Sequence, residues 1–300
     1  MKNKLKNILL IIPHDFISFI GCVLVIVGMY ISRAMISIGM ITLLFSAIVN
    51  VKLLSNFKWF IQKPHLVLLT GYFLIFGVSF FWSSNTNYFS ERMQIMLPFL
   101  ILPFSFFSMH RWQIKWYDSL TIIFITLNFA GILWSCSEYF LHQENYDNSY
   151  HFSKLIPTPF KNDHIRFSLS VVMSICFCAE FFIRNTKPFL RIFLLFLILI
   201  DILYIHILAA KTGVIAFYLV AIIAIIQVIF STKFRKLGIA SLFLLIILPF
   251  VMYAVLPSFK NKIGYIKYSI FRMQNNEKET NISDEGRIIS YQYALQIIKE

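Results

Sequence analysis

The chain of 300 residues is 58% hydrophobic and only 14% charged, whereas soluble domains carry about 25% charged residues. This composition excludes an ordinary soluble globular protein. Apolar runs of roughly 17 to 22 residues recur, and each is long enough to cross a bilayer as a helix. The net charge of +13 does not indicate nucleic acid as a partner, because loop lysines of membrane proteins produce the same excess. The sequence therefore predicts an all-α, polytopic transmembrane helical bundle in a lipid bilayer.

Nine membrane spans are predicted in chain order. They cover residues 16–31, 35–54, 65–82, 93–109, 118–141, 165–183, 189–209, 213–230 and 238–256. The basic N-terminal segment is similar to the start of a signal peptide, but Pro13, His14 and Asp15 interrupt the apolar run that follows it. We therefore expect a first span that is retained rather than cleaved.

Lysine and arginine are unevenly divided between the two sides of the predicted bundle. The N-terminal segment and the short loops on its side carry fourteen of them, and the short loops on the other side carry six. Because positively charged loops stay on the cytoplasmic side of a membrane, the N-terminus is predicted to be cytoplasmic. Nine spans then place residues 257–300 outside. The predicted domains are a transmembrane bundle over residues 1–256 and the start of a large outer loop over residues 257–300.

Residues 257–300 differ sharply in composition from the chain before them, since they are polar, basic and rich in tyrosine. Within this segment Ser283 or Asp284 can cap a helix. The apolar positions that follow are Ile288, Tyr291, Leu295 and Ile298. This spacing predicts an amphipathic helix that lies against the membrane or against the outer ends of the spans.

Three cations on the predicted outer side are candidates for binding an anion. Lys211 precedes the start of a helix, whose backbone N–H groups would add donors. Arg287 lies in the first turn of the amphipathic helix, where the helix dipole disfavours a cation, and Arg166 opens the sixth span. The structural alternatives are a lysine that marks a turn, an arginine paired with Asp284, and an interface anchor. Anionic lipid phosphate is the natural ligand for such a set of cations.

Two ionisable residues lie inside the seventh predicted span. Asp201 and His206 are five residues apart, which is about 140° around a helix, so they do not share a face. Structural pairing with neighbouring spans is the favoured interpretation for both, although His206 is close enough to the outer end to serve the same site as Lys211. The four cysteines lie in apolar runs without metal-binding spacing, so neither a metal nor another cofactor is predicted.

Three segments resemble the O-antigen ligase and O-antigen polymerase superfamily of bacterial inner-membrane proteins. They are GRIISYQYALQIIKE at the C-terminal end, AAKTGVIAFYLVAIIAI around Lys211, and FWSSNTNYFSERMQIMLPFLILPFSF before and within the fourth span. The resemblance is clearest over about residues 165–300. It implies a metal-independent, GT-C-like membrane glycosyltransferase of lipopolysaccharide or other surface polysaccharide biosynthesis, with a periplasmic active face. The donor would be a glycan on undecaprenyl pyrophosphate, and the acceptor a growing glycan or the lipid A core.

The resemblance also implies roles for individual residues. Arg287 matches the family's loop arginine, Lys211 stands where the family has arginine, and Arg166 is a weaker match. Together they would bind the pyrophosphate of the donor. The family's general-base histidine is expected beyond Glu300, so no catalytic residue is predicted in this chain, which would be an inactive, C-terminally truncated member. A transporter or flippase of lipid-linked glycans and a non-catalytic membrane subunit are the alternatives.

Overall fold

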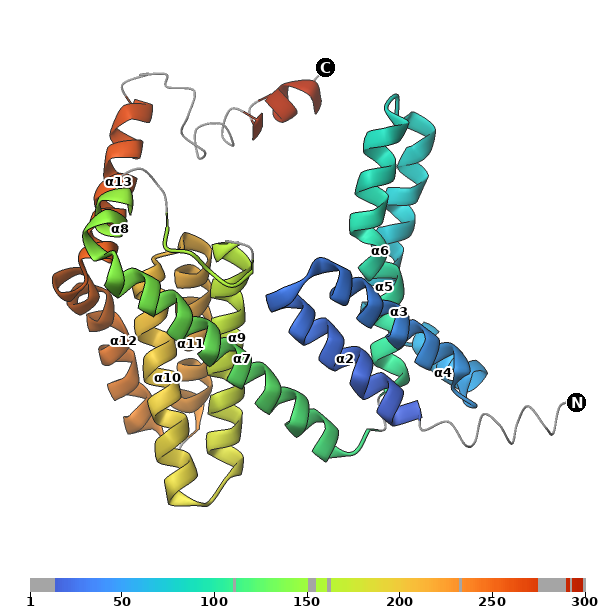
Figure 1. Ribbon diagram of the computed structural model, residues 1–300, viewed down its shortest axis with the longest axis horizontal. Helices are drawn as coiled ribbons and strands as arrows, with labels where there is room; N and C mark the ends of the chain where they lie inside the picture. Colours follow the sequence, from blue (N-terminus) through green and yellow to red (C-terminus); the bar gives the residue numbers. More distant parts are fainter. Residues whose placement is uncertain are drawn as a thin grey trace, which may run out of the picture. The chain divides into compact units, whose positions relative to one another are not determined.

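The computed structural model describes residues 14–109, 112–150, 155–160, 163–231, 234–274, 290–291 and 293–298. Every regular element in this part of the chain is helical (Figure 1). The chain divides into two compact units, Met1–Leu127 and Asn128–Glu300. The division falls within helix α7 (Ile114–Leu141), so the first half of this helix belongs to one unit and the second half to the other.

The first unit consists of two helical hairpins and a short helix between them. Its elements are α2 (His14–Ile31), α3 (Arg33–Val49), α4 (Leu53–Ile61), α5 (Pro64–Val78), the 3-10 helix η1 (Ser79–Trp82), α6 (Thr86–Ser108) and the first half of α7. Ser32 alone separates α2 from α3, and its hydroxyl caps the N-terminus of α3. Cys22 and Leu43 of this hairpin pack with Met109 and Trp112 in one apolar cluster.

The second unit is an up-and-down array of long helices. After the second half of α7 come α8 (Gln143–Tyr150), α9 (His164–Arg184), α10 (Pro188–Leu208), α11 (Lys211–Phe230), α12 (Arg235–Val255) and α13 (Pro257–Gln274). Only two or three residues connect α9 to α10 and α10 to α11, so α9 and α11 run parallel (Figure 1). Pro188 is the first residue of α10. A backbone N–H at this position has no partner within the helix, so proline, which lacks an N–H, is tolerated there. Ala209 ends α10 in the left-handed conformation, with φ at 48°.

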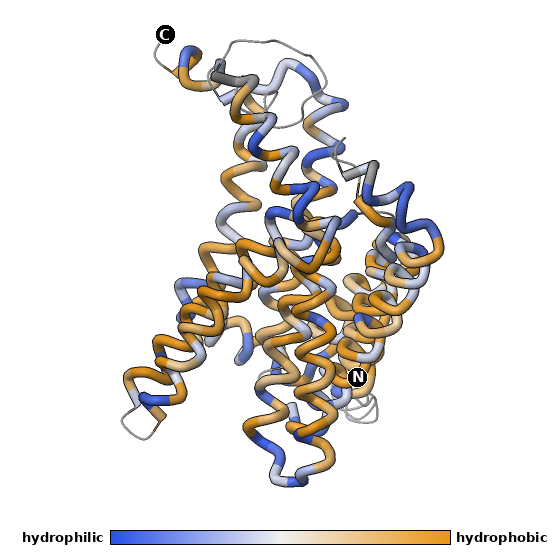
Figure 2. The backbone as a smooth tube through the Cα atoms, turned by 90° about the vertical axis from the view of Figure 1, so that its left-hand side faces the viewer, coloured by the Kyte–Doolittle hydropathy of each residue, from blue (hydrophilic) through white to orange (hydrophobic). Residues whose placement is uncertain are grey.

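Within the described residues, seven helical segments are long and apolar enough to cross a membrane. They are His14–Ile31, Pro64–Trp82, Ile114–Leu141, His164–Arg184, Pro188–Leu208, Lys211–Phe230 and Arg235–Val255. Hydrophobic residues follow the lengths of the helices, and hydrophilic residues gather mainly at their ends and connections (Figure 2). Many large apolar side chains point outward, such as Phe189 and Phe230, each 83% exposed. Such side chains need lipid around them, so the chain is a multi-pass membrane protein.

Each of the nine predicted spans coincides with a helix in the described part of the chain, but two of these helices do not qualify by themselves. The span over residues 35–54 is predicted too long, because α3 has 17 residues and ends where the backbone of Asn50 becomes extended. Together with α4 it would form an eighth span, bent by 106°. In α6, Glu91 and Arg92 shorten the apolar stretch. The described residues thus give seven or eight spans instead of nine, and the sidedness of the chain stays a prediction.

The polar segment after residue 256 begins with a helix. α13 follows α12 after Leu256 alone and packs beside α8. The side-chain amide of Asn261 donates a hydrogen bond to the carbonyl of Asp147 in α8 at 3.1 Å. Residues 290–291 and 293–298 are helical too, in agreement with the amphipathic pattern. Arg287, one of the three cations of the predicted anion site, lies outside the described residues.

Candidate functional site

Arg166 and Lys211 lie at the same end of the second unit. Arg166 is in the first turn of α9, and Lys211 is the first residue of α11. Because α9 and α11 are parallel, their N-termini share one end of the bundle, together with the C-terminus of α10 (Figure 1). Arg166 and Lys211 therefore lie at one end of the helices, and their predicted role in an anion site stays a prediction.

The N-terminal parts of α9 and α11 approach each other at Gly213 and Ser168. A Cβ atom built on Gly213 would lie 2.3 Å from Cβ and 2.5 Å from Oγ of Ser168. These separations are far shorter than van der Waals contact, so only glycine allows the two helix backbones to pack this closely. The contact fixes which faces of α9 and α11 are turned toward each other.

The same contact turns Arg166 and Lys211 to different faces. Each cation precedes its contact residue by two positions, which is about 200° around an α-helix. Arg166 instead forms an ion pair with Asp163, with Nε 3.1 Å from Oδ2, and its side chain is 69% exposed. The structure therefore brings the two helix ends together but does not bring these two side chains to one face.

The two helix N-termini also differ in how their backbone N–H groups are satisfied. Asp163 caps α9, since its Oδ1 accepts a hydrogen bond from the N–H of Arg166 at 3.1 Å. Ala210 at the N-cap of α11 provides no side-chain hydrogen bond. The end of α11 is thus the one where an anion would meet a helix dipole without a competing carboxylate cap.

Lys211 shares its face of α11 with Tyr218. The two residues are seven positions apart, so they lie within about 20° of each other around the helix axis. The hydroxyl of Tyr218 is 3.0 Å from Nε2 of His206, which is in the last turn of α10. On the other side of the ring, Nδ1 of His206 is 2.8 Å from the carbonyl oxygen of Ile202.

This pair of hydrogen bonds determines the tautomer of His206. A carbonyl oxygen can only accept, so Nδ1 carries the hydrogen and donates it to Ile202. In the neutral ring Nε2 is then an acceptor, and the O–H of Tyr218 donates to it. His206 is thereby a base whose free nitrogen is directed at one hydroxyl group.

Aromatic rings enclose this hydrogen-bonded pair. His206 is 0% exposed, and its ring centroid lies 5.9 Å from Phe217 and 5.4 Å from Phe259 of α13. One turn beyond Phe259, the buried face of α13 contains Lys262, which is 6% exposed. We call His206, Lys211, Tyr218, Phe259 and Lys262 the α10–α11–α13 cluster. It contains a histidine–tyrosine pair, a lysine on the same face of α11 as Tyr218, and a lysine of α13 whose Nζ lies 5.1 Å from the ring centroid of Tyr265.

Three members of this cluster were not predicted from the sequence. Tyr218 had a signal, because its spacing of seven from Lys211 places both on one helix face. Phe259 and Lys262 had none, since nothing in the sequence shows that the start of α13 packs against the end of α10. His206 lies near the end of the bundle where Lys211 lies, which the interpretation that both serve the same site requires.

Buried hydrogen bonds hold the surrounding elements in place. Ser135 of α7 accepts a hydrogen bond from the hydroxyl of Tyr204 at 2.9 Å and donates one to the carbonyl of Pro157 at 2.7 Å. Ser170 of α9 donates to the side-chain oxygen of Asn128 at 2.7 Å. These bonds connect α7 to α9, to α10 and to the segment over residues 155–160.

Asp201 lies apart from the cluster, on another face of α10. It is 2% exposed, and its carboxyl group is near the hydroxyl of Ser174 in α9. Its Oδ2 atom has no hydrogen-bond partner within the described residues. The predicted pairing of Asp201 with a neighbouring helix is thus satisfied on one oxygen only.

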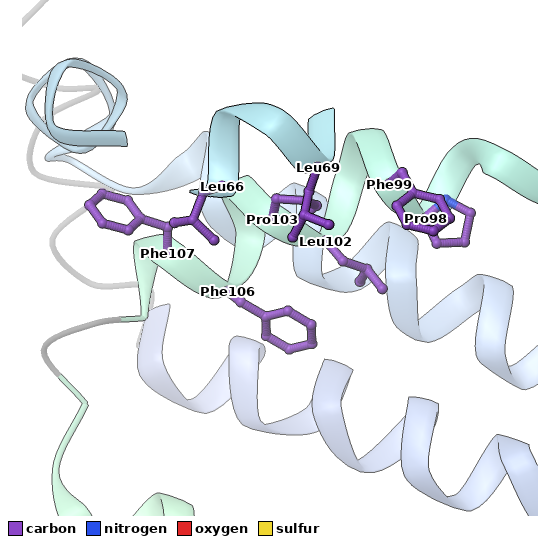
Figure 3. Close-up of a pocket in the computed structure, with 8 residues that line it drawn as sticks. All are labelled: Leu66, Leu69, Pro98, Phe99, Leu102, Pro103, Phe106 and Phe107. Carbon is purple, nitrogen blue, oxygen red and sulfur yellow. The ribbon is translucent and has the colours of Figure 1, made fainter. Parts of the chain in front are cut away.

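The described residues contain no group of three His, Cys, Asp or Glu side chains that could hold a metal ion. The four cysteines are free, and Cys22 and Cys178 are buried as apolar core residues. A separate apolar pocket of about 610 Å³ lies in the first unit, between Leu66 and Leu69 of α5 and six residues of α6 (Figure 3). Its lining offers proline rings, aromatic rings and leucine side chains rather than reactive groups.

No protein-family model, no curated protein and no solved structure matches this chain. The structure by itself defines an all-helical, multi-pass membrane protein.

Proposed function

We propose that this protein transfers a glycan from undecaprenyl pyrophosphate to a hydroxyl of an acceptor, either a growing glycan or the lipid A core. The reaction takes place at the periplasmic face of the bacterial inner membrane, without a metal or another cofactor. The observation that carries the proposal is the α10–α11–α13 cluster, in which Lys211 begins α11 at an N-terminus without a side-chain cap and Lys262 lies one turn beyond Phe259 in α13.

Electrostatics explain why such a cluster suits a lipid pyrophosphate. Negative charge grows on the pyrophosphate oxygen as the glycosidic bond breaks, and fixed cations stabilise that charge in the transition state. An ammonium group is a compact point charge, so Lys211 and Lys262 would attract the pyrophosphate without the bidentate geometry of arginine. The α11 dipole adds to this attraction at close range.

The apolar surface of the second unit suits the remainder of the donor. A polyprenyl chain needs hydrocarbon surroundings, which the outward-facing side chains of α10, α11 and α12 share with the lipid. The phosphate groups would then lie at the helix ends, where the cations are. Arg166 belongs to the same end, and it would contact the donor only from the α9 side.

The proposal predicts that Lys211→Ala weakens binding of undecaprenyl pyrophosphate to the full chain in lipid nanodiscs. Loss of one charge-assisted contact of about 1.5 to 3 kcal/mol corresponds to roughly a 10- to 100-fold higher Kd. Native mass spectrometry with undecaprenyl pyrophosphate as the probe measures this change. Lys236→Ala is the matched control, because Lys236 is an exposed lysine in the first turn of α12, at the other end of the bundle.

If Lys211→Ala and Lys236→Ala bound undecaprenyl pyrophosphate with equal affinity, Lys211 would not be part of the donor site. The transfer reaction itself is tested with an undecaprenyl-pyrophosphate-linked glycan and an acceptor glycan, followed by the release of free undecaprenyl pyrophosphate. Binding without any release would contradict the transferase and leave a binding or transport function.

Transport of a lipid-linked glycan is the second candidate, and Asp201 is the observation that favours it. A buried carboxyl group with one unpartnered oxygen among the described residues, in the interior of a membrane helix, is typical of ion-coupled carriers. A flippase would move a fluorescent lipid-linked glycan between the leaflets of a proteoliposome and would lose this activity in Asp201→Asn. A transferase would release the lipid pyrophosphate instead.

A further inference from the structure

We infer that Tyr218, with His206 behind it, is the proton-transfer pair of this site, so that the chain contains an acid–base centre of its own. The inference rests on the proposed function, because it assigns the group that accepts the proton of the acceptor hydroxyl. Tyr218 is the catalytic residue, and His206 acts through it.

The hydrogen-bond directions support this assignment. The carbonyl of Ile202 fixes the hydrogen of His206 on Nδ1, at 2.8 Å, and leaves Nε2 to accept from the hydroxyl of Tyr218, at 3.0 Å. A base oriented by a second group on its far side is the arrangement that activates a hydroxyl for proton transfer. Phe217 and Phe259 pack around the imidazole and exclude water from it.

Accessibility separates the roles of the two residues. His206 is fully buried and cannot contact a substrate, whereas Tyr218 is partly exposed. Side chains on a helix lean toward its N-terminus, so the ring of Tyr218 leans toward the end of α11 that carries Lys211. The phenol oxygen thus meets the buried base from the face of α11 that also carries Lys211.

The step that follows is balanced in atoms and charge. The acceptor oxygen attacks the anomeric carbon of the donor while its proton passes to the oxygen of Tyr218. The original phenol proton passes at the same time to Nε2 of His206. The bond between the anomeric carbon and the pyrophosphate oxygen breaks, and the electron pair leaves with the pyrophosphate, next to Lys211 and Lys262. The extra proton of His206 later returns to the oxygen of Tyr218, as the hydroxyl of Tyr218 gives its own proton to water.

The same geometry would arise if the bond only held α10 against α11. The two roles differ in the reactivity of the phenol oxygen, because a base within hydrogen-bonding distance makes that oxygen a better nucleophile. Reactivity therefore tests the pair without a known acceptor.

The experiment treats the full chain in nanodiscs with an aryl sulfonyl fluoride and maps labelled tyrosines by mass spectrometry. The oxygen of Tyr218 attacks sulfur, the S–F bond breaks, fluoride leaves, and the proton goes to His206. We expect Tyr218 to be labelled at least about tenfold faster than Tyr253, and His206→Gln to remove this advantage. Tyr253 is the internal reference because it is 39% exposed on α12.

Glutamine at position 206 retains a hydrogen-bond acceptor for Tyr218 but is not a base, so a structural bond would be largely kept. Phe230→Leu is the control variant, since it changes an exposed ring at the other end of α11, and the labelling rate of Tyr218 should be unchanged. If His206→Gln does not fold, the wild-type protein still tests the inference, because the ratio of the Tyr218 and Tyr253 labelling rates can be measured in it. A ratio near one, or an unchanged Tyr218 rate in His206→Gln, overturns the inference.

The activity measurement distinguishes this inference from the proposed function. With the lipid-linked donor, Tyr218→Phe should lower kcat by about 100-fold and leave KM unchanged. Suppose that Tyr218 is labelled fast and in a His206-dependent way, but the protein releases no undecaprenyl pyrophosphate. This result would contradict the proposed transferase function and still support the Tyr218–His206 proton-transfer pair. If Tyr218→Phe released undecaprenyl pyrophosphate at the wild-type rate, the transferase function would stand and the proton-transfer role of Tyr218 and His206 would be refuted.

Discussion

Replacing Gly213 with alanine is expected to destabilise the protein by about 1 to 3 kcal/mol, because the new methyl group overpacks a close helix contact. Alanine normally favours a helix by about 1 kcal/mol over glycine. Here that gain is outweighed, since the Cβ atom would lie 2.3 Å from Cβ of Ser168 and α9 would have to move away from α11. Thermal unfolding of the purified protein in detergent, followed by circular dichroism, should show a lower Tm.

Gly264→Ala is the matched control for this change. Gly264 is also helical, in α13, but a Cβ built on it meets nothing within 4 Å, so alanine there should raise stability slightly. Ser168→Gly removes the side-chain atoms that the methyl group of Gly213→Ala would meet, and the double variant should recover part of the loss. If Gly213→Ala were as stable as the wild type, the close packing of α9 on α11 would be refuted.

Most of the helices could be predicted from the sequence because the bilayer imposes one simple rule. A span needs an uninterrupted apolar stretch, and α10, α11 and α12 meet that need so clearly that their predicted boundaries differ by only a few residues from the observed ones. α3 and α6 were harder, because the bend after Asn50 and the charges at Glu91 and Arg92 act against membrane crossing. Composition alone does not decide how such helices lie.

The candidate site was only partly predictable, for a different reason. Charge and position identify Arg166 and Lys211 as cations at helix ends, but a sequence does not show which helix faces meet. Gly213 and Ser168 decide that in the structure, and they turn the two cations apart. Phe259 instead reaches His206, because the start of α13 packs against α10, a long-range contact that no local pattern encodes.

Replacing Ser135 with alanine is expected to destabilise the second unit by about 1 to 2 kcal/mol, because it leaves a buried hydroxyl without a partner. Ser135 is the shared partner of Tyr204 and of the carbonyl of Pro157. Tyr204 is 1% exposed, so water cannot replace the lost bond. The segment over residues 155–160 should also loosen, and its amides should exchange hydrogen faster in mass-spectrometric measurements.

Ser137→Ala provides the control on the same helix. Ser137 is exposed, and its hydroxyl bonds only locally, to the carbonyl of Trp134, so its loss should change stability by less than about 0.5 kcal/mol. Adding Tyr204→Phe to Ser135→Ala removes both partners and should cost less than the sum of the two single changes. Strict additivity would show that Ser135 and Tyr204 do not interact. The buried network would then not be what holds α7 to α10, and the end of α10 that positions His206 would depend on apolar packing alone.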